Sequence, residues 1–161
     1  MKEVQSPEFK SYAEQVVANA RALADYLSSK NYALVSGGTD THLILWDLRP
    51  EDITGAKFEA ICDAVGITLN KNSVYGDAKA FSPGGVRIGT PALTSRNYKE
   101  EDFRKVGEYL HSTLELAKEI QLEGRKLKDF KKNLKSNSKV QELREDIVNF
   151  ARRFYMPGGF R

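Results

Sequence analysis

The stretch Ser82-Pro-Gly-Gly-Val-Arg-Ile-Gly-Thr-Pro-Ala-Leu-Thr-Ser-Arg96 is the part of the chain from which the rest is best interpreted. Its centre, Gly85-Val-Arg-Ile-Gly89, predicts a short apolar strand, and Pro91 predicts a turn or short helix after it. A buried charge is costly without a partner, so Arg87 within this strand predicts a bound anion. A guanidinium suits a carboxylate or phosphate held by two hydrogen bonds, and the glycines at 84 and 85 are expected to let a ligand come close. A structural ion pair is the alternative explanation.

The segments before this strand predict a long helix, a hairpin and a second helix. Ser6 is placed to cap a helix that begins at Pro7, whose apolar residues keep the i, i+3, i+4 spacing for about six turns. Residues 32–35 and 42–47 predict two strands of a hairpin. Thr54 predicts a helix start and Gly66 its end, before a strand at 67–70 and a loop at 71–84.

The segments after it predict more helix. Three carboxylates at residues 100–102 favour a helix start, and the apolar spacing continues to Ile120. Residues 126–136 predict a loose helix or linker. Ser138 to Gln141 resembles a capping box for a last helix, which the Met156-Pro-Gly-Gly159 segment is expected to stop.

This order of elements predicts an α+β fold, with a small, mostly antiparallel sheet, helices on one face and a long N-terminal helix. We expect a connecting helix in residues 1–30, a small α/β sandwich in 31–120 and a basic helical extension in 121–161, together forming one domain.

Composition excludes several classes of protein. No apolar run approaches the roughly 20 residues of a membrane span, and the first residues lack the features of a signal peptide. One cysteine, Cys62, with two histidines offers no disulfide and no zinc-type cluster, so no metal site is expected. Residues 121–161 hold 11 of the 25 Lys and Arg but 5 of the 22 Asp and Glu. Because no aromatic stacking pattern accompanies these cations, the tail is expected to be a solvated face, and no nucleic-acid partner is expected.

Two further places carry polar side chains that could contact a ligand. The loop Asn70-Lys71-Asn72-Ser73 offers amides and one ammonium, which could recognise a flat heterocycle or an acidic group, although its composition is also that of an ordinary polar turn. His42 flanks the first hairpin, where an internal hydrogen bond is a simpler explanation than acid–base work. No catalytic triad or phosphate-binding glycine loop is visible, so no catalytic residue is assigned.

Five segments, in order, resemble the C-terminal part of serine hydroxymethyltransferases, a family of pyridoxal-phosphate enzymes of fold type I. They are Ser6-Pro-Glu-Phe-Lys10 with Gln15-Val-Val-Ala-Asn19, Leu34-Val-Ser-Gly-Gly-Thr-Asp40 with His42, Asn70-Lys-Asn72, Gly85-Val-Arg-Ile-Gly-Thr-Pro-Ala-Leu-Thr94, and Arg96. Lys126-Leu-Lys-Asp-Phe130 and the ending Phe154-Tyr-Met-Pro-Gly158 resemble the eukaryotic branch.

The resemblance implies an enzyme that interconverts serine and tetrahydrofolate with glycine and methylenetetrahydrofolate. It implies that Arg87 binds the substrate carboxylate and that Asn72 lies at the folate site, with Lys71 a weaker folate-side candidate. Arg96 and His42 are implied as supporting residues. The chain departs from the family pattern at Tyr75, where proline is usual, and at Asn97, where glycine is usual; asparagine tolerates the positive φ that such a turn needs.

The family's cofactor lysine has no counterpart in this sequence, so the chain is expected to be a fragment that binds neither pyridoxal phosphate nor tetrahydrofolate stably and is inactive alone. The full-length enzyme is expected to be a homodimer or tetramer in the cytoplasm, with a mitochondrial or plastid form left open. Two alternatives are a stand-alone carboxylate- or folate-binding module and the small domain of a related pyridoxal-phosphate aldolase or aminotransferase.

Overall fold

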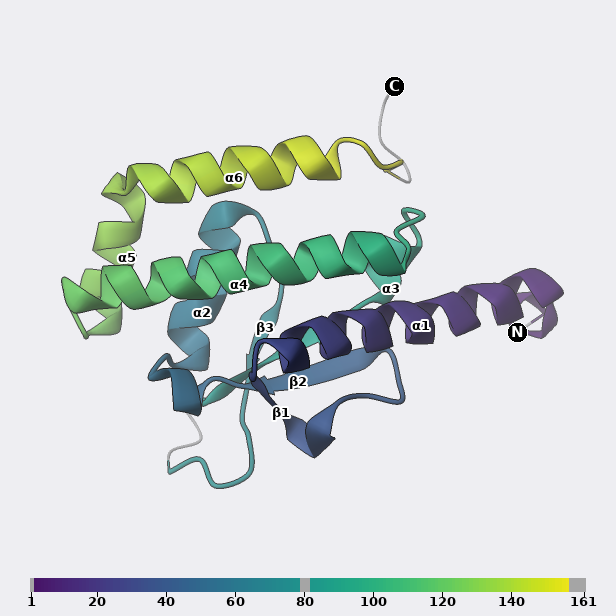
Figure 1. The fold of residues 1–161 in the computed structure, drawn as a ribbon, viewed down its shortest axis with the longest axis horizontal. Coiled ribbons are helices and arrows are strands. Elements are labelled where there is room, and N and C mark those ends of the chain that lie inside the picture. Colours follow the sequence, from purple (N-terminus) through teal and green to yellow (C-terminus); the bar gives the residue numbers. More distant parts are fainter. Residues whose placement is uncertain (1, 79–81, 157–161) are drawn as a thin grey trace.

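The structure, a computed structural model, describes residues 2–78 and 82–156. A four-stranded sheet with the order β1-β2-β4-β3 lies against the helices, and every pairing in it is antiparallel (Figure 1). The α+β prediction is therefore confirmed, including the long N-terminal helix. The strands are β1 (Ala33–Leu34), β2 (Leu43–Asp47), β3 (Asn70–Asn72) and β4 (Gly85–Gly89).

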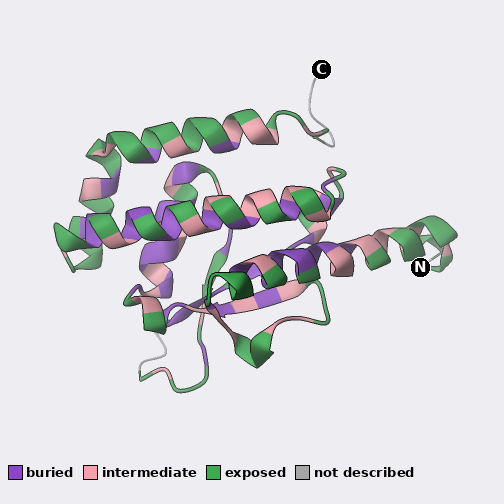
Figure 2. Cartoon of the chain, in the orientation of Figure 1, coloured by how far each residue is buried: buried purple, intermediate pink, exposed green. Residues whose placement is uncertain are grey.

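The two central strands bury one face and expose the other. Ile44 and Trp46 of β2 are buried, as are Val86 and Ile88 of β4, and these four side chains face the helices. The residues between them are partly or fully exposed, a strand alternation visible along β2 in Figure 2. The sheet thus has a helix-covered face and an open face.

The helices are α1 (Pro7–Ser29), α2 (Gly55–Val65), α3 (Pro91–Thr94), α4 (Glu100–Leu122), α5 (Leu127–Ser136) and α6 (Ser138–Ala151), with single 3₁₀ turns at Glu3–Gln5, Val35–Gly37 and Arg49–Glu51. The predicted ends of α1 and α2 are confirmed: Ser6 Oγ accepts from Phe9 N at 3.2 Å, Thr54 caps α2, and Gly66 ends it with φ 90°.

The core lies between the sheet and the helices. The Trp46 ring lies 4.7 Å from Tyr32 and 5.3 Å from Phe58 between ring centroids, and Cys62 is fully buried beside this group. In α1 the buried residues begin at Val16, so the first turns of this helix extend past the sheet and are less covered (Figures 1 and 2).

Two local predictions, for the strand at 67–70 and the cap at Ser138, were wrong, and for 126–136 the helix alternative is the one observed. The strand predicted at 67–70 begins only at Asn70, because the polar residues 70–72 pair with β4 while Leu69 enters the core. Residues 127–136 form a regular helix, since Phe130 and Leu134, one turn apart, are both buried. The cap of α6 is Asn137, whose side chain accepts from Val140 N, in place of Ser138.

The last helix ends at Ala151, before the predicted stop. Part of that stop, residues 157–159, lies outside the described residues. In the basic tail the four lysines of α5 are all exposed, as expected of a solvated face: Lys128, Lys131, Lys132 and Lys135.

Candidate functional site

Arg87 lies at the middle of β4 on the open face of the sheet, and its side chain is exposed. The prediction that this arginine is buried was wrong, because Val86 and Ile88 take the two inward positions and the alternation directs residue 87 outward. No hydrogen bond or ion pair joins its guanidinium to another residue in ranges 2–78 and 82–156. The group is therefore available to bind an anion from solvent or from another protein surface.

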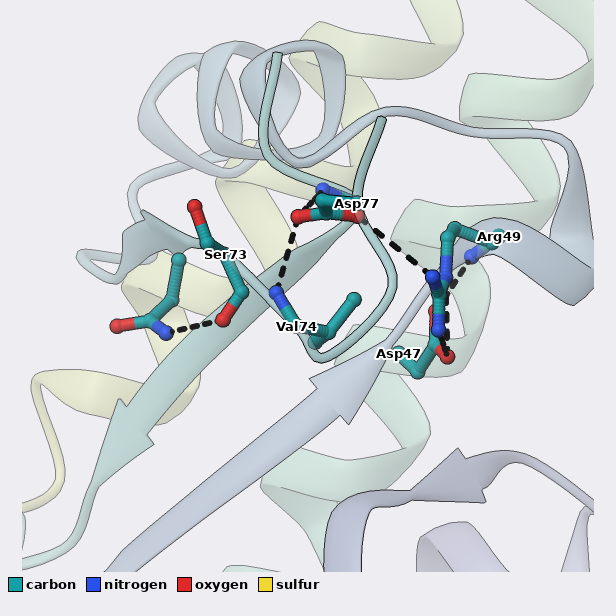
Figure 3. Close-up of polar contacts among 7 residues, drawn as sticks. Asp47, Arg49, Ser73, Val74 and Asp77 are labelled. Atoms are coloured by element: carbon teal, nitrogen blue, oxygen red, sulfur yellow. Dashed lines mark hydrogen bonds and ion pairs between the residues drawn. The ribbon is translucent and has the colours of Figure 1, made fainter. Parts of the chain in front are cut away.

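The strand register places Asn72 on the same face as Arg87. Arg87 is paired with Leu45 on one side and Asn70 on the other, and Asn72 is paired with Gly85. Asn72 and Arg87 are thus diagonal neighbours, for which Cβ separations of about 7–8 Å are typical. The Asn72 side-chain amide donates to the Ser73 carbonyl at 2.7 Å, which leaves its oxygen as an acceptor (Figure 3).

Lys71 lies on the opposite, helix-covered face. Its Nζ contacts Glu59 Oε2 at 2.7 Å, and its backbone N–H donates to Glu59 Oε1 at 3.1 Å. Partial burial acts to raise the pKa of Glu59, but these hydrogen bonds from Lys71 bring the pKa below its ordinary value. The structure therefore joins Lys71 to α2 and separates it from Arg87 and Asn72.

Arg96 points to the C-terminal end of α6. Its Nη2 donates to the Ala151 carbonyl at 2.7 Å and its Nε to the Tyr155 carbonyl at 3.0 Å, while the guanidinium lies 5.6 Å from the Tyr98 ring centroid. These bonds join the segment after α3 to the last residue of α6 and to the segment that follows it. The role seen for Arg96 is to attach the last helix, and Asn97 beside it has the expected positive φ, 68°.

His42 comes directly before β2 and is exposed. Its carbonyl accepts from Thr90 N at 3.1 Å, but its ring forms no hydrogen bond with any residue that the structure describes. The expected internal hydrogen bond of the imidazole is therefore absent there.

The glycine pair before Arg87 admits protein atoms where a ligand was expected. A Cβ on Gly84 would lie 2.6 Å from Asp77 Oδ1, and a Cβ on Gly85 would lie 2.7 Å from Val74 Cγ1. Asp77 and its partner Arg49 were missed by sequence reasoning. The Gly76-Asp77 pair, a turn signal three residues after Ser73, could have indicated Asp77.

A buried hydrogen-bond network holds the segment after β4 against α1. The Asn19 amide donates to Thr94 Oγ1 and to the Tyr98 carbonyl, both at 2.9 Å, and Thr90 Oγ1 donates to the Val16 carbonyl at 2.9 Å. Two of the quoted sequence segments, 15–19 and 85–94, are therefore in direct contact. Their contact fixes the end of the strand that carries Arg87.

Two further classes of site were checked. No group of three or more metal-ligating side chains occurs in the described part of the chain. None of the described helices has the length and apolar character needed to cross a membrane.

Comparison with known proteins gives a consistent result. The model of the family "Serine hydroxymethyltransferase" matches residues 1–110. The chain is 52% identical over 161 residues to serine hydroxymethyltransferase 5 of Arabidopsis thaliana, covering 99% of this chain and 34% of that protein. It is 45% identical to a cytosolic serine hydroxymethyltransferase of Neurospora crassa (98% and 34% covered) and 46% identical to the chloroplastic serine hydroxymethyltransferase 3 of Arabidopsis thaliana (98% and 31%).

The chain thus spans about a third of the length of these relatives, whose names give more than one compartment. The family match covers more than half of the chain and includes the five quoted segments. It favours a fragment of a serine hydroxymethyltransferase over the small domain of a related aldolase or aminotransferase. The chain belongs to the serine hydroxymethyltransferase family.

Proposed function

We propose that this chain supplies the substrate-carboxylate part of a serine hydroxymethyltransferase, an enzyme that interconverts serine and tetrahydrofolate with glycine and methylenetetrahydrofolate. The observation that supports the proposal most is the exposed, unpartnered guanidinium of Arg87 among the described residues, on the open face of a central strand. A planar guanidinium carried on this strand can hold the serine or glycine carboxylate by two charge-assisted hydrogen bonds.

Asn72 is proposed to contact the folate. Its position on the Arg87 face and its available amide oxygen are suited to a heterocycle with hydrogen-bond donors. Lys71 has weaker support, because it lies on the other face with Glu59. Arg96 and His42 are kept as supporting residues, Arg96 through its attachment of α6.

The open face does not fit pyridoxal phosphate as an attachment site. Attachment of that cofactor needs a lysine amine, and Lys71, the lysine within the site segments, points away from Arg87. Pyridoxal phosphate supplies the electron sink of such reactions when bound. We propose that pyridoxal phosphate is held by the other two thirds of a full-length enzyme of the relatives' size. We propose also that the chain alone is inactive.

The test is a chimera in which residues 1–161 replace the matching third of the Arabidopsis thaliana relative. The chimera is expected to convert serine and tetrahydrofolate to glycine. Arg87→Lys should lower kcat/KM for serine roughly 10-fold to 150-fold, because an ammonium loses a bidentate bond to a charged group worth about 1.5–3 kcal/mol.

Arg104→Lys is the matched control, since this arginine of α4 is an exposed partner of Glu101. An Arg87→Lys chimera with the kinetics of the Arg104→Lys control would refute the carboxylate role of Arg87.

Oligomer formation, as a homodimer or tetramer, is proposed for the full-length protein alone. The stand-alone binding module remains the second candidate, because the Arg87 guanidinium is already exposed in this chain. Calorimetry of the chain with serine, glycine and tetrahydrofolate distinguishes the two. Heat of binding below millimolar concentrations would favour the module, and none would favour the incomplete site.

A further inference from the structure

The open face is built from two rungs of paired residues across three strands. Asp47, Gly85 and Asn72 form one rung, and Leu45, Arg87 and Asn70 form the next rung on the same face. Beyond the first rung the chain leaves the sheet, at Ser73 after β3 and at Gly84 before β4. The backbone pairs set the register of Asn72 and Arg87, and the way residues 73 and 84 are held sets how firmly this end of the β3–β4 pair is closed.

The Asp77 carboxylate joins these two ends. Its Oδ2 accepts from Val74 N at 2.9 Å and from Gly84 N at 3.0 Å (Figure 3). The side chain is only 8% exposed, so these charge-assisted bonds are little weakened by water. One side chain thus continues the β3–β4 pairing beyond the last backbone pair.

Arg49 connects the Asp77 carboxylate to β2, the third strand of the first rung. Its Nε lies 2.9 Å from Asp47 Oδ1 and its Nη2 2.7 Å from Asp47 Oδ2, while its Nη1 lies 3.8 Å from Asp77 Oδ1. The hydrogen bond from Arg49, more than the opposing effect of burial, lowers the pKa of Asp47. We call Asp47, Arg49 and Asp77 the clasp.

The glycines around the clasp are needed for its close packing. Gly84 lies against Arg49, because an added Cβ would be 2.7 Å from Arg49 Cγ. Gly76 has φ 87°, and its Cβ would lie 3.3 Å from Arg49 Nη1. A larger residue at either place would push the guanidinium away from Asp77.

We propose that Arg49 and Asp77 are positioning residues, which hold Asn72 and Arg87 at one fixed spacing on the open face so that folate and amino acid bind together. This inference rests on the proposed function. The clasp side chains do not touch substrate in this role; they act through the backbone N–H groups of Val74, two residues from Asn72, and Gly84, three residues from Arg87.

The test uses the chimeric enzyme and measures KM and kcat separately. Asp77→Ala should raise KM for tetrahydrofolate on the order of tenfold, the effect of about 1.4 kcal/mol of lost binding, with kcat at saturating substrate nearly unchanged. Asp77→Asn should restore most of the loss, because an amide oxygen can still accept from Val74 and Gly84. Arg49→Gln, which spares those two bonds, should give an intermediate KM.

Asp63→Ala, an exposed aspartate of α2, is the matched control and should leave both constants unchanged. Hydrogen exchange of the backbone amides of Val74 and Gly84, measured in the isotope-labelled chain, reports directly on their bonds to Asp77. Asp77→Ala should accelerate this exchange. Faster exchange with an unchanged KM for tetrahydrofolate would overturn the positioning role. If Asp77→Ala does not fold, the Arg49→Gln variant is the test of the positioning role. An unchanged KM for tetrahydrofolate in Arg49→Gln would also overturn that role. Failure of the proposed function would appear separately, as an Arg87→Lys chimera with unaltered serine kinetics.

Discussion

At the scale of single residues, Asn19 shows how a buried amide can fix the site strand from a distance. It is fully buried, donates two hydrogen bonds across to residues 94 and 98, and accepts from Gln15 Nε2 at 3.0 Å. A hydrophobic residue of the same size can form none of these three hydrogen bonds. Asn19 is therefore a main buried hydrogen-bonding contact between α1 and the segment after β4, beside the bond from Thr90 Oγ1 to the Val16 carbonyl.

Asn19→Leu is expected to destabilise the chain. The Tyr98 carbonyl would be left buried without its donor, which costs about 1–3 kcal/mol. The free energy of unfolding from urea denaturation measures the effect. Asn149→Leu, at an exposed position of α6, is the control and should change stability by less than about 0.5 kcal/mol. Equal effects of the two substitutions would contradict the importance of the buried network.

At the scale of elements, the sequence predicted those segments whose local signals agree with their tertiary contacts. β4 begins and ends where predicted, and α2 has both predicted caps. β3 was displaced because its polar residues owe their strand geometry to pairing with β4, and the exposed Lys71 is paired with Glu59 of α2. That contact has no signal in the sequence near residue 71.

The candidate site shows the same limit. Arg87 was identified correctly as exceptional, but the flanking glycines suggested a cavity, whereas they make room for Asp77 and Val74. Its exposure follows from strand alternation alone and could have been predicted. The complete clasp could not, since Asp77 reaches the local Asp47–Arg49 pair only through the fold of the sheet.

The attachment of α6 by Arg96 gives a prediction at this scale. Arg96→Ala should lower the free energy of unfolding by about 1.5–3 kcal/mol, because the variant loses charge-assisted hydrogen bonds to the carbonyls of residues 151 and 155. Denaturation followed by far-ultraviolet circular dichroism measures it. Arg152→Ala, an exposed arginine of the same helix end, is the control, and a loss as large in that variant would show that general charge at the helix end, rather than these bonds, is responsible.

At the scale of the whole molecule, the helix layer is joined by a buried lysine. Lys57 of α2 is 7% exposed, donates to Gln121 Oε1 of α4 and lies 5.8 Å from the Phe130 ring centroid of α5. Gln121 in turn donates to the Asp52 carbonyl at 2.8 Å. Three helices therefore meet at one ammonium group, which has a single hydrogen-bond acceptor among the described residues.

This arrangement makes the stability of the chain depend on pH in a defined direction. Burial is the main cause that lowers the pKa of Lys57; nearby Asp52 opposes this and Arg125 adds to it. The unfolded chain, with a lysine pKa of about 10.4, then holds more protons than the folded chain between the lowered folded pKa and that value. The free energy of unfolding contributed by Lys57 must rise with pH across this window.

The comparison of the wild-type chain with Lys57→Met isolates this contribution, because tyrosines and the other lysines titrate alike in both. Wild type should gain stability relative to the variant between about pH 7.5 and about pH 10, where the unfavourable buried ammonium becomes neutral. Urea denaturation of both proteins at each pH gives the difference between their free energies of unfolding. Lys139→Met, which removes an exposed lysine paired with Glu119, should show no such gain over this range, since that ion pair raises the pKa of Lys139 and its stabilisation is lost only as pH rises above the ordinary lysine pKa. If the free energy of unfolding of wild type, relative to that of Lys57→Met, stays constant or falls with pH, the three helices accommodate the charged lysine without penalty.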